Sequence, residues 1–308
     1  MATDRDTTMT TPVTTGYQEP NVHIHSTDDE TLRRISHNDP DVAGLAVRFV
    51  GIVDMEWVDR IGSAISNSIH LRRLDISYWS ASACRSEQME LFFRHLAHNR
   101  SIEHLTVDSI DNSAVDIFAI LAPFFEQNHN FRCIKTIGGC FSMISFISAL
   151  ERPKANRLER IDLSGNEIGD EVLPDLINAL TVMPGLNILS ELSLGFNRIK
   201  NEGCKKLGEL LKNTSSGIQC LDLQHNFMDD TGIGFLLAGF LENATLRSLN
   251  LSSQRKLRAE SWRMLSAYLR SPNCLLETLY LGAESHIRFL SRKCPRRQQH
   301  IEMHELRM

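Results

Sequence analysis

The sequence contains no long apolar run and no large excess of charge of one sign. A membrane-spanning helix needs about 18 or more mostly apolar residues, and this chain has no such run. No apolar segment follows a basic start, so no secretory signal is predicted. The net charge of −5 does not suit a dedicated nucleic-acid binder, which needs a strongly basic face. These absences predict a cytoplasmic protein without membrane or nucleic-acid contact, and the basic run 292–297 leaves a nuclear location open.

Paired cysteines and the common catalytic motifs are also missing. The seven cysteines contain no C-x-x-C pair, which favours reduced thiols that behave as small buried hydrophobes. Neither G-x-S-x-G nor G-x-x-x-x-G-K-[ST] occurs. His95 and His98 have no accompanying Cys or carboxylate motif, and the Glu between His300 and His304 is not adjacent to the first His. We therefore predict no enzyme activity, no catalytic residue, no cofactor and no bound metal.

Four Asn-x-Ser/Thr triplets match the acceptor pattern for N-linked glycosylation. They begin at Asn99, Asn213, Asn243 and Asn250. An intracellular chain does not meet the glycosylation machinery, and the last triplet lies within a predicted strand. We interpret the triplets as accidental.

What the sequence does contain is one pattern repeated three times in succession, L-x-x-L-x-L-x-x-N-x-L, at residues 158–168, 189–199 and 218–228. Its second and third apolar positions alternate with polar ones, which predicts a short strand with one buried face. The Asn is placed to hydrogen-bond backbone groups of a neighbouring copy. Residues that often cap helices follow twelve positions after each start, at Asp170, Asn201 and Asp230, which predicts a helix in each unit.

The same register extends in both directions with less regular sequence. Nine units start at residues 42, 71, 102, 131, 158, 189, 218, 246 and 276, and we call them repeats one to nine. The pattern and the 27 to 31 residue spacing resemble the ribonuclease-inhibitor-like branch of the leucine-rich repeats. That resemblance implies an α/β solenoid, a horseshoe of about nine strand-turn-helix units with a concave parallel sheet and convex helices. The Asn position holds Trp79, Ile110, Gly139 and Gln254 in the outer repeats, which leaves their turn geometry open.

Four segments are expected along the chain. Residues 1–26 are polar and Thr-rich and are predicted to be a disordered tail. Residues 27–41 begin with a capping box from Thr27 to Glu30 and are predicted to form a helix and turn that cover the first repeat. The array occupies residues 42–285. Residues 286–308 carry a local charge of +4 and are predicted to form a basic cap or tail.

The concave sheet face is where we expect a protein partner to bind. Side chains at offsets two, four, six and seven from each start should point out of the sheet there, and several are aromatic or charged, as binding anchors often are. The expected partner is a protein of unknown identity, bound by a monomeric chain. The predicted protein-binding residues are Arg73, Asp75, Tyr78, His104, Asp108, Lys135, Arg160, Asp162, Phe196, Asp222, His225 and Tyr280.

Two further functions share this repeat type. A GTPase-activating protein for the nuclear-transport GTPase is the alternative, by analogy of fold alone. The chain has no long acidic C-terminal tail, which counts against it. An adaptor of a ubiquitin ligase would need a helical docking box before the repeats, and the polar residues 1–26 have too few apolar side chains to supply one.

Overall fold

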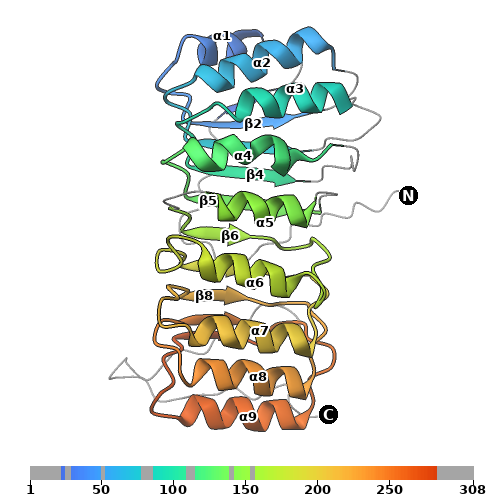
Figure 1. Cartoon of the computed structure of the whole chain (residues 1–308), viewed down its shortest axis with the longest axis vertical. Helices are drawn as coiled ribbons and strands as arrows, with labels where there is room; N and C mark the ends of the chain where they lie inside the picture. Colours follow the sequence, from blue (N-terminus) through green and yellow to red (C-terminus); the bar gives the residue numbers. More distant parts are fainter. Residues whose placement is uncertain are drawn as a thin grey trace, which may run out of the picture.

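The computed structural model describes residues 22–24, 29–49, 53–77, 86–108, 115–138, 142–152 and 157–282. Within these ranges the chain forms two layers, a parallel sheet of ten strands in sequential order and one row of nine helices against it (Figure 1). The strands are β1 (Val22–Ile24), β2 (Gly44–Arg48), β3 (Arg73–Ser77), β4 (His104–Asp108), β5 (Cys133–Ile137), β6 (Arg160–Asp162), β7 (Glu191–Ser193), β8 (Cys220–Asp222), β9 (Ser248–Asn250) and β10 (Thr278–Tyr280). The helices are α1 (Asp29–Ser36), α2 (Met55–Asn67), α3 (Ser86–Leu96), α4 (Ile117–Gln127), α5 (Met143–Glu151), α6 (Leu173–Val182), α7 (Asn201–Lys212), α8 (Asp230–Phe240) and α9 (Ala259–Arg270).

All nine predicted strands are present, in one unbroken register. The residue at offset two pairs with its counterpart in every step from β3 to β10, so the units with irregular sequence stack like the regular ones. The fold is the predicted horseshoe, with the sheet on the concave side. No helix in the described ranges is both long and apolar enough to cross a bilayer.

The N-terminal end differs from the prediction in one respect. Residues 22–24, expected to be part of a disordered tail, form β1 and pair in parallel with β2. This contact satisfies backbone groups that would otherwise be unpaired at the sheet edge. Thr27 of the predicted capping box lies outside the described residues, but α1 begins at Asp29 and buries Leu32 and Ile35 as expected.

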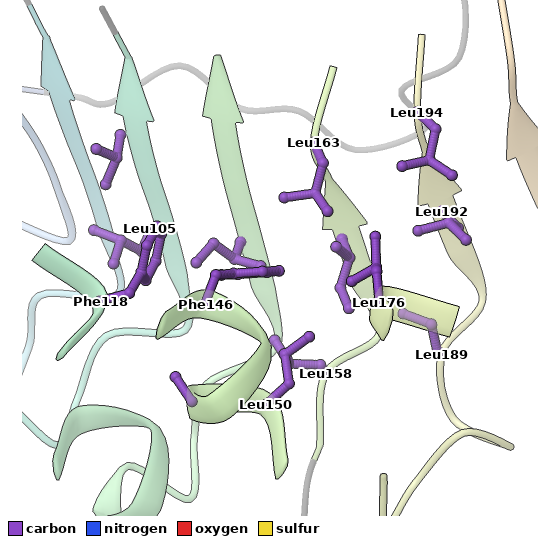
Figure 2. Close-up of a cluster of buried hydrophobic side chains, with 14 of the residues drawn as sticks. Leu105, Phe118, Phe146, Leu150, Leu158, Leu163, Leu176, Leu189, Leu192 and Leu194 are labelled. Atoms are coloured by element: carbon purple, nitrogen blue, oxygen red, sulfur yellow. The ribbon is translucent and has the colours of Figure 1, made fainter. Parts of the chain in front are cut away.

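The core lies between the two layers and changes composition along the stack. From repeat five onward it is built mainly from leucines of the strands and helices, as Figure 2 shows for Leu163, Leu176 and Leu192. Nearer the N-terminus, phenylalanines fill the same space and contact each other edge to face; the Phe118 and Phe146 rings, for example, lie 4.9 Å apart. Larger side chains thus maintain packing where the leucine pattern is weak.

The predicted asparagine ladder is confirmed. Asn197 accepts hydrogen bonds from the backbone N–H groups of Asn166 and Ile168, at 3.1 and 2.8 Å, and donates to the Leu163 carbonyl at 2.9 Å. Asn226 repeats this pattern one unit later, accepting from the Ile199 N–H. Each asparagine therefore joins its own turn to the backbone of the preceding repeat.

Two polar residues that depart from the repeat pattern support the ladder. Gln254 stands where an Asn was expected, and its Nε2 donates to the Leu223 carbonyl at 2.5 Å. The longer side chain thus makes the cross-repeat bond. Thr136 occupies a buried position normally held by Leu, where its carbonyl and hydroxyl both accept from Asn166 Nδ2. Trp79, Ile110 and Gly139 lie outside the described residues.

The predicted caps act differently from the expectation. The N-caps of α6, α7 and α8 are Val172, Lys200 and Asp229, so Asp170, Asn201 and Asp230 are not the caps of their own helices. Each accepts a hydrogen bond from a backbone N–H at the helix start of the next repeat. The distances from donor nitrogen to acceptor oxygen are 2.7, 3.2 and 3.0 Å. The first N–H groups of a helix have no partner within it, so a carboxylate or amide from the neighbouring unit satisfies them equally well. These side chains join consecutive repeats.

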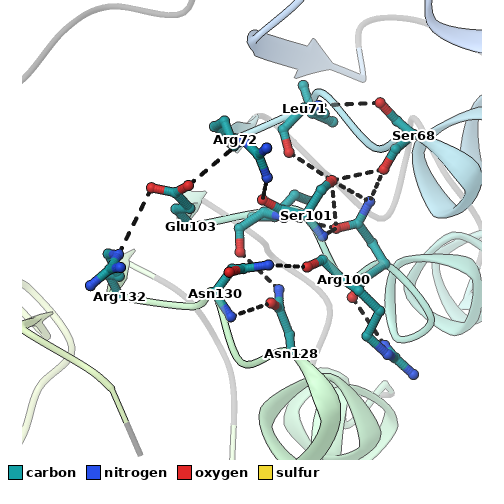
Figure 3. Close-up of polar contacts among 11 residues, drawn as sticks. Ser68, Leu71, Arg72, Arg100, Ser101, Glu103, Asn128, Asn130 and Arg132 are labelled. Carbon is teal, nitrogen blue, oxygen red and sulfur yellow. Dashed lines mark hydrogen bonds and ion pairs between the residues drawn. The ribbon is translucent and has the colours of Figure 1, made fainter. Parts of the chain in front are cut away.

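A second polar ladder follows the helices and was not expected from the sequence. Asn99 is fully buried, and its Nδ2 donates to the Ile65 and Ser68 carbonyls of the preceding repeat. The Ser101 hydroxyl donates to the Leu71 carbonyl (Figure 3). Asn243 and Thr245 repeat the arrangement on Leu211 and Ile218. Two of the four Asn-x-Ser/Thr triplets, at Asn99 and Asn243, therefore belong to a structural motif in which the Asn amide is used within the fold.

Candidate functional site: the concave sheet face

The concave face of β3 to β8 presents the side chains that alternate with the core residues. Every strand from β3 to β8 shows the same alternation, in which the middle residue at offset three is buried and its neighbours at offsets two and four are half-buried. Eight predicted residues lie in this half-buried set on the strands. They are Arg73, Asp75, His104, Asp108, Lys135, Arg160, Asp162 and Asp222.

Of the other predicted binding residues, Tyr78 lies outside the described ranges. Tyr280 is only 7% exposed, and Asn250 on the adjacent strand is only 1% exposed, although both occupy outward offsets. Covering an aromatic ring removes a large apolar area from water and is favourable. The prediction that Tyr280 is an exposed binding residue is therefore wrong, and at offset four the half-buried row ends at β8, while Ser248 and Thr278 at offset two are still half-buried.

Ion pairs neutralise most charges at the centre of the face. Lys135 Nζ lies 3.4 Å from Asp162 Oδ2, and Arg160 Nε lies 3.3 Å from Glu191 Oε1. Burial raises the pKa of Glu191, and the Arg160 guanidinium partly opposes that shift. Both pairs connect adjacent strands, so they hold the lattice in place.

Asp222 is the carboxylate that lacks such a partner. It accepts hydrogen bonds from the Gln224 N–H at 2.8 Å and from Asn250 Nδ2 at 3.1 Å, and no cation of the described chain pairs with it. Burial raises the pKa of Asp222 to about 6 despite these hydrogen bonds. Gly195 lies beside it; a Cβ there would be 3.4 Å from Asp222 Oδ1 and 2.9 Å from the Gln224 side chain. A side chain at this position would therefore crowd Asp222 and Gln224.

Phe196 and His225 form an aromatic pair next to this carboxylate. Their rings stack with centroids 5.0 Å apart and planes at 21°, and Phe196 is 36% exposed. Both have left-handed backbone, with φ of 53° and 51°, at an offset that Gly138 and Gly165 occupy in earlier repeats. This conformation costs a residue with a Cβ about 1–2 kcal/mol relative to ordinary backbone. Ser253 has the same backbone at this offset in repeat eight, so the conformation belongs to the turn of the repeat, and the two rings lie where that turn places them.

The N-terminal part of the face carries charges of both signs and no activated side chain. Burial and the nearby Arg73 lower the pKa of His104, which favours the neutral ring. Burial raises the pKa of Cys133 to about 12 and that of Cys220 to about 11, which keeps both thiols protonated. Neither cysteine is therefore activated as a nucleophile. In the described part of the chain, no group of three or more His, Cys, Asp or Glu side chains is arranged to hold a metal ion.

Comparison with known proteins agrees with this geometry. A family model described as a leucine-rich repeat matches residues 156–171 and 186–208. The chain contains leucine-rich repeats. It is 32% identical over 133 residues, 43% of this chain, to NACHT, LRR and PYD domains-containing protein 9 of Bos taurus, and 25% identical over 201 residues, 64% of this chain, to protein 5 of that series from Mus musculus. It spans only 13% and 17% of their lengths.

Among solved structures, one from the Rad7–Elc1 complex of yeast superposes with a TM-score of 0.57 at 15% identity, over 82% of this chain and 59% of that one. Similarity at this level of identity shows the shared fold and no more. The relatives support assignment of this leucine-rich-repeat protein as an interaction scaffold in general terms.

Two further sets of surface residues, at offsets one and nine of the repeats, were not among the predicted binding residues. At offset one, directly before four consecutive strands, the charges alternate in sign at Arg72, Glu103, Arg132 and Glu159, with N–O distances of 3.7, 3.9 and 2.6 Å. Figure 3 shows the first three of these side chains. At offset nine, Phe227 is 38% exposed, and Arg198 pairs with Glu167 at 2.7 Å. A systematic comparison of offsets one and nine between repeats, which needs only the sequence, would have found both sets.

Proposed function

We propose that this protein is a non-enzymatic, intracellular scaffold or regulator that binds a protein partner on the concave face of β3 to β8. The observation that carries the proposal is the Phe196–His225 stack, exposed and held in left-handed backbone at the edge of the lattice. Interface energy usually concentrates in a few aromatic and arginine anchors, and Arg160 lies on the strand before Phe196. The array 42–285 is the binding domain in this proposal, and the chain acts as a monomer in the cytoplasm.

The size of the face is adequate for such a partner. Six strands at about 4.8 Å spacing extend about 24 Å across the stack, and the turns after them widen the surface. A specific protein interface covers roughly 800 Å² on each partner, which this area can supply. Small side chains at Ser164, Ser193 and Gly195 let a partner approach the sheet closely.

The test compares two triple alanine variants of the whole chain. The concave variant changes Arg160, Phe196 and His225. The convex control changes Lys205, Lys206 and Glu209 on α7, of which Lys205 and Glu209 are exposed. Alanine retains the Cβ, so it leaves the left-handed backbone at Phe196 and His225 under similar strain. The concave variant also removes the cation that pairs with Glu191, so thermal melting must show that both variants are fully folded at the temperature of the binding assay.

Partners are first captured with the wild-type chain by cross-linking and identified by mass spectrometry, and their Kd values are then measured for each variant. Each anchor is expected to contribute about 2 kcal/mol or more, which corresponds to at least a roughly thirtyfold loss of affinity. We expect the concave variant to lose binding and the convex control to retain it. The reverse result would place the partner on the helices and refute the proposal.

A further inference from the structure

Asp222 carries a charge that its position in the fold does not need. Its Oδ1 accepts a hydrogen bond from the Gln224 N–H, two residues later, at 2.8 Å. At the same offset of repeat eight, Asn250 Oδ1 accepts a hydrogen bond from the Ser252 N–H at 3.0 Å. The turn after the strand therefore needs an oxygen acceptor at this offset, and an uncharged amide supplies one as well as a carboxylate does.

The charge of Asp222 also has no counter-ion in the described part of the chain. Asp162, at the same offset of repeat five, accepts a turn hydrogen bond from the Ser164 N–H at 3.0 Å, but Lys135 Nζ lies 3.4 Å from its other oxygen. The described groups that donate to Asp222 are neutral amides. Burial first, and the like charge of Asp162 second, raise the pKa of Asp222. A half-buried carboxylate in this position attracts a cation from another molecule.

An aromatic ring lies beside this carboxylate. A Cβ on Gly195 would be 3.4 Å from Asp222 Oδ1, and Phe196 is the next residue. The Phe196 ring stacks on His225 toward repeat seven. Toward repeat five, the residue at the same offset is Gly165, which has no side chain to cover the ring, and Phe196 is 36% exposed. A single side chain that enters here meets both an aromatic ring and a carboxylate.

A guanidinium group suits this combination better than an ammonium group. Its plane stacks on an aromatic ring while its N–H groups donate to a carboxylate. It is also less strongly hydrated, so it loses less on leaving water for a half-buried site. We propose that Asp222 and the Phe196–His225 pair receive an arginine side chain of the protein partner. This assignment rests on the proposed function, which supplies the partner but not the kind of side chain.

The test uses N-acetyl-arginine methylamide as the probe and the whole chain with isotope-labelled Phe and His rings. NMR titration at neutral pH follows the Phe196 and His225 signals. A fragment of this size with good contacts should bind with a Kd of about 1–10 mM. The citrulline analogue has nearly the same shape without the charge, and it should bind at least about tenfold more weakly. The lysine analogue has the charge without the planar group, and it should bind about threefold more weakly.

Two variants separate a site at Asp222 from the general charge of the concave face. Asp222→Asn keeps the turn acceptor, as Asn250 shows, and should weaken binding of the arginine probe at least about tenfold. Asp162→Asn removes a charge at the same offset that Lys135 already neutralises, and should weaken it less than about threefold. Thermal melting must show that each variant is folded at the temperature of the titration.

Three results would overturn the arginine site. They are the absence of a saturable shift of the Phe196 and His225 signals up to about 50 mM probe, equal binding of the arginine and citrulline probes, and equal losses in the two Asn variants. None of them touches the proposed function, because the partner titration with the Arg160, Phe196 and His225 variant does not use the probe. Conversely, if the probe binds as expected and that variant retains the partner, the proposed function fails while the affinity of the site for guanidinium stands.

Discussion

Replacement of Asn197 by alanine tests the physical basis of the stack directly. The side chain is 2% exposed and makes four hydrogen bonds, accepting from the Asn166 and Ile168 N–H groups and donating to the Leu163 and Gly195 carbonyls. Alanine removes all four. Ile168 is itself buried, so its N–H has no ready access to water once the amide is gone.

The expected cost follows from these contacts. A buried donor left without a partner costs about 1–3 kcal/mol, and the half-buried Asn166 N–H costs less because water can reach it. We therefore expect Asn197→Ala to lower the free energy of unfolding by roughly 2–4 kcal/mol. The exposed Asn67 makes one hydrogen bond, to the Ser63 carbonyl within α2, and Asn67→Ala should change stability by less than about 0.5 kcal/mol.

Urea denaturation measures the total loss, and hydrogen exchange with mass spectrometry locates it. Repeats contact mainly their neighbours, so protection should fall first between residues 157 and 200 and less between 248 and 282. Uniform loss over the whole array, or a loss no larger than that of Asn67→Ala, would refute the ladder as a main source of stability.

Three further outcomes are expected. Leu221→Ala opens a cavity beneath β8 and should cost about 2–5 kcal/mol in urea denaturation. Gly239→Ala should lower the melting temperature, although alanine usually favours helix, because its Cβ would lie 2.7 Å from Gly208 Cα on α7. Asp222→Asn should stabilise the fold at pH 7.5 by roughly 1–3 kcal/mol. The pKa of Asp222 is about 6 in the folded chain and lower in the unfolded chain, so the wild-type fold loses stability as the pH rises through that range and the carboxyl ionises. The difference in stability between variant and wild type should therefore vanish below about pH 4. A difference that does not depend on pH would contradict this assignment.

Most of the fold could be predicted from the sequence, because each strand lies at a fixed offset in its repeat and shows alternating apolar and polar residues. Every strand from β2 to β10 falls at its expected offset, and Asn197 and Asn226 bond as expected. The contacts of Asp170 were mispredicted because a cap can be supplied by a neighbouring unit, and one sequence cannot tell the two apart. β1 was not predicted, because a segment of only three residues forms a strand when it pairs with an open sheet edge, here that of β2.

Less of the candidate site could be predicted from the sequence. Offsets predicted which side chains point outward, but not which are covered, and Tyr280 shows the difference. Pairing is also a matter of geometry: Asp162 and Asp222 occupy the same offset, yet only Asp162 has a cation within reach. The backbone of Phe196 and His225 could have been suspected from the glycines at Gly138 and Gly165, which hold the same offset.

The asparagine motif of the helix side makes this fold incompatible with one covalent modification. A glycan on Asn99 would replace a hydrogen of the Nδ2 that donates to Ile65 and Ser68, at a site with no exposed surface. A glycan on Asn243 would likewise replace a hydrogen of the Nδ2 that donates to the Leu211 carbonyl. Attachment occurs at an amide that is still accessible, so a chain directed through a secretory pathway would be modified before its repeats close. Each attached sugar would then separate two adjacent units, and production of this protein by secretion should give chains that fail to stack.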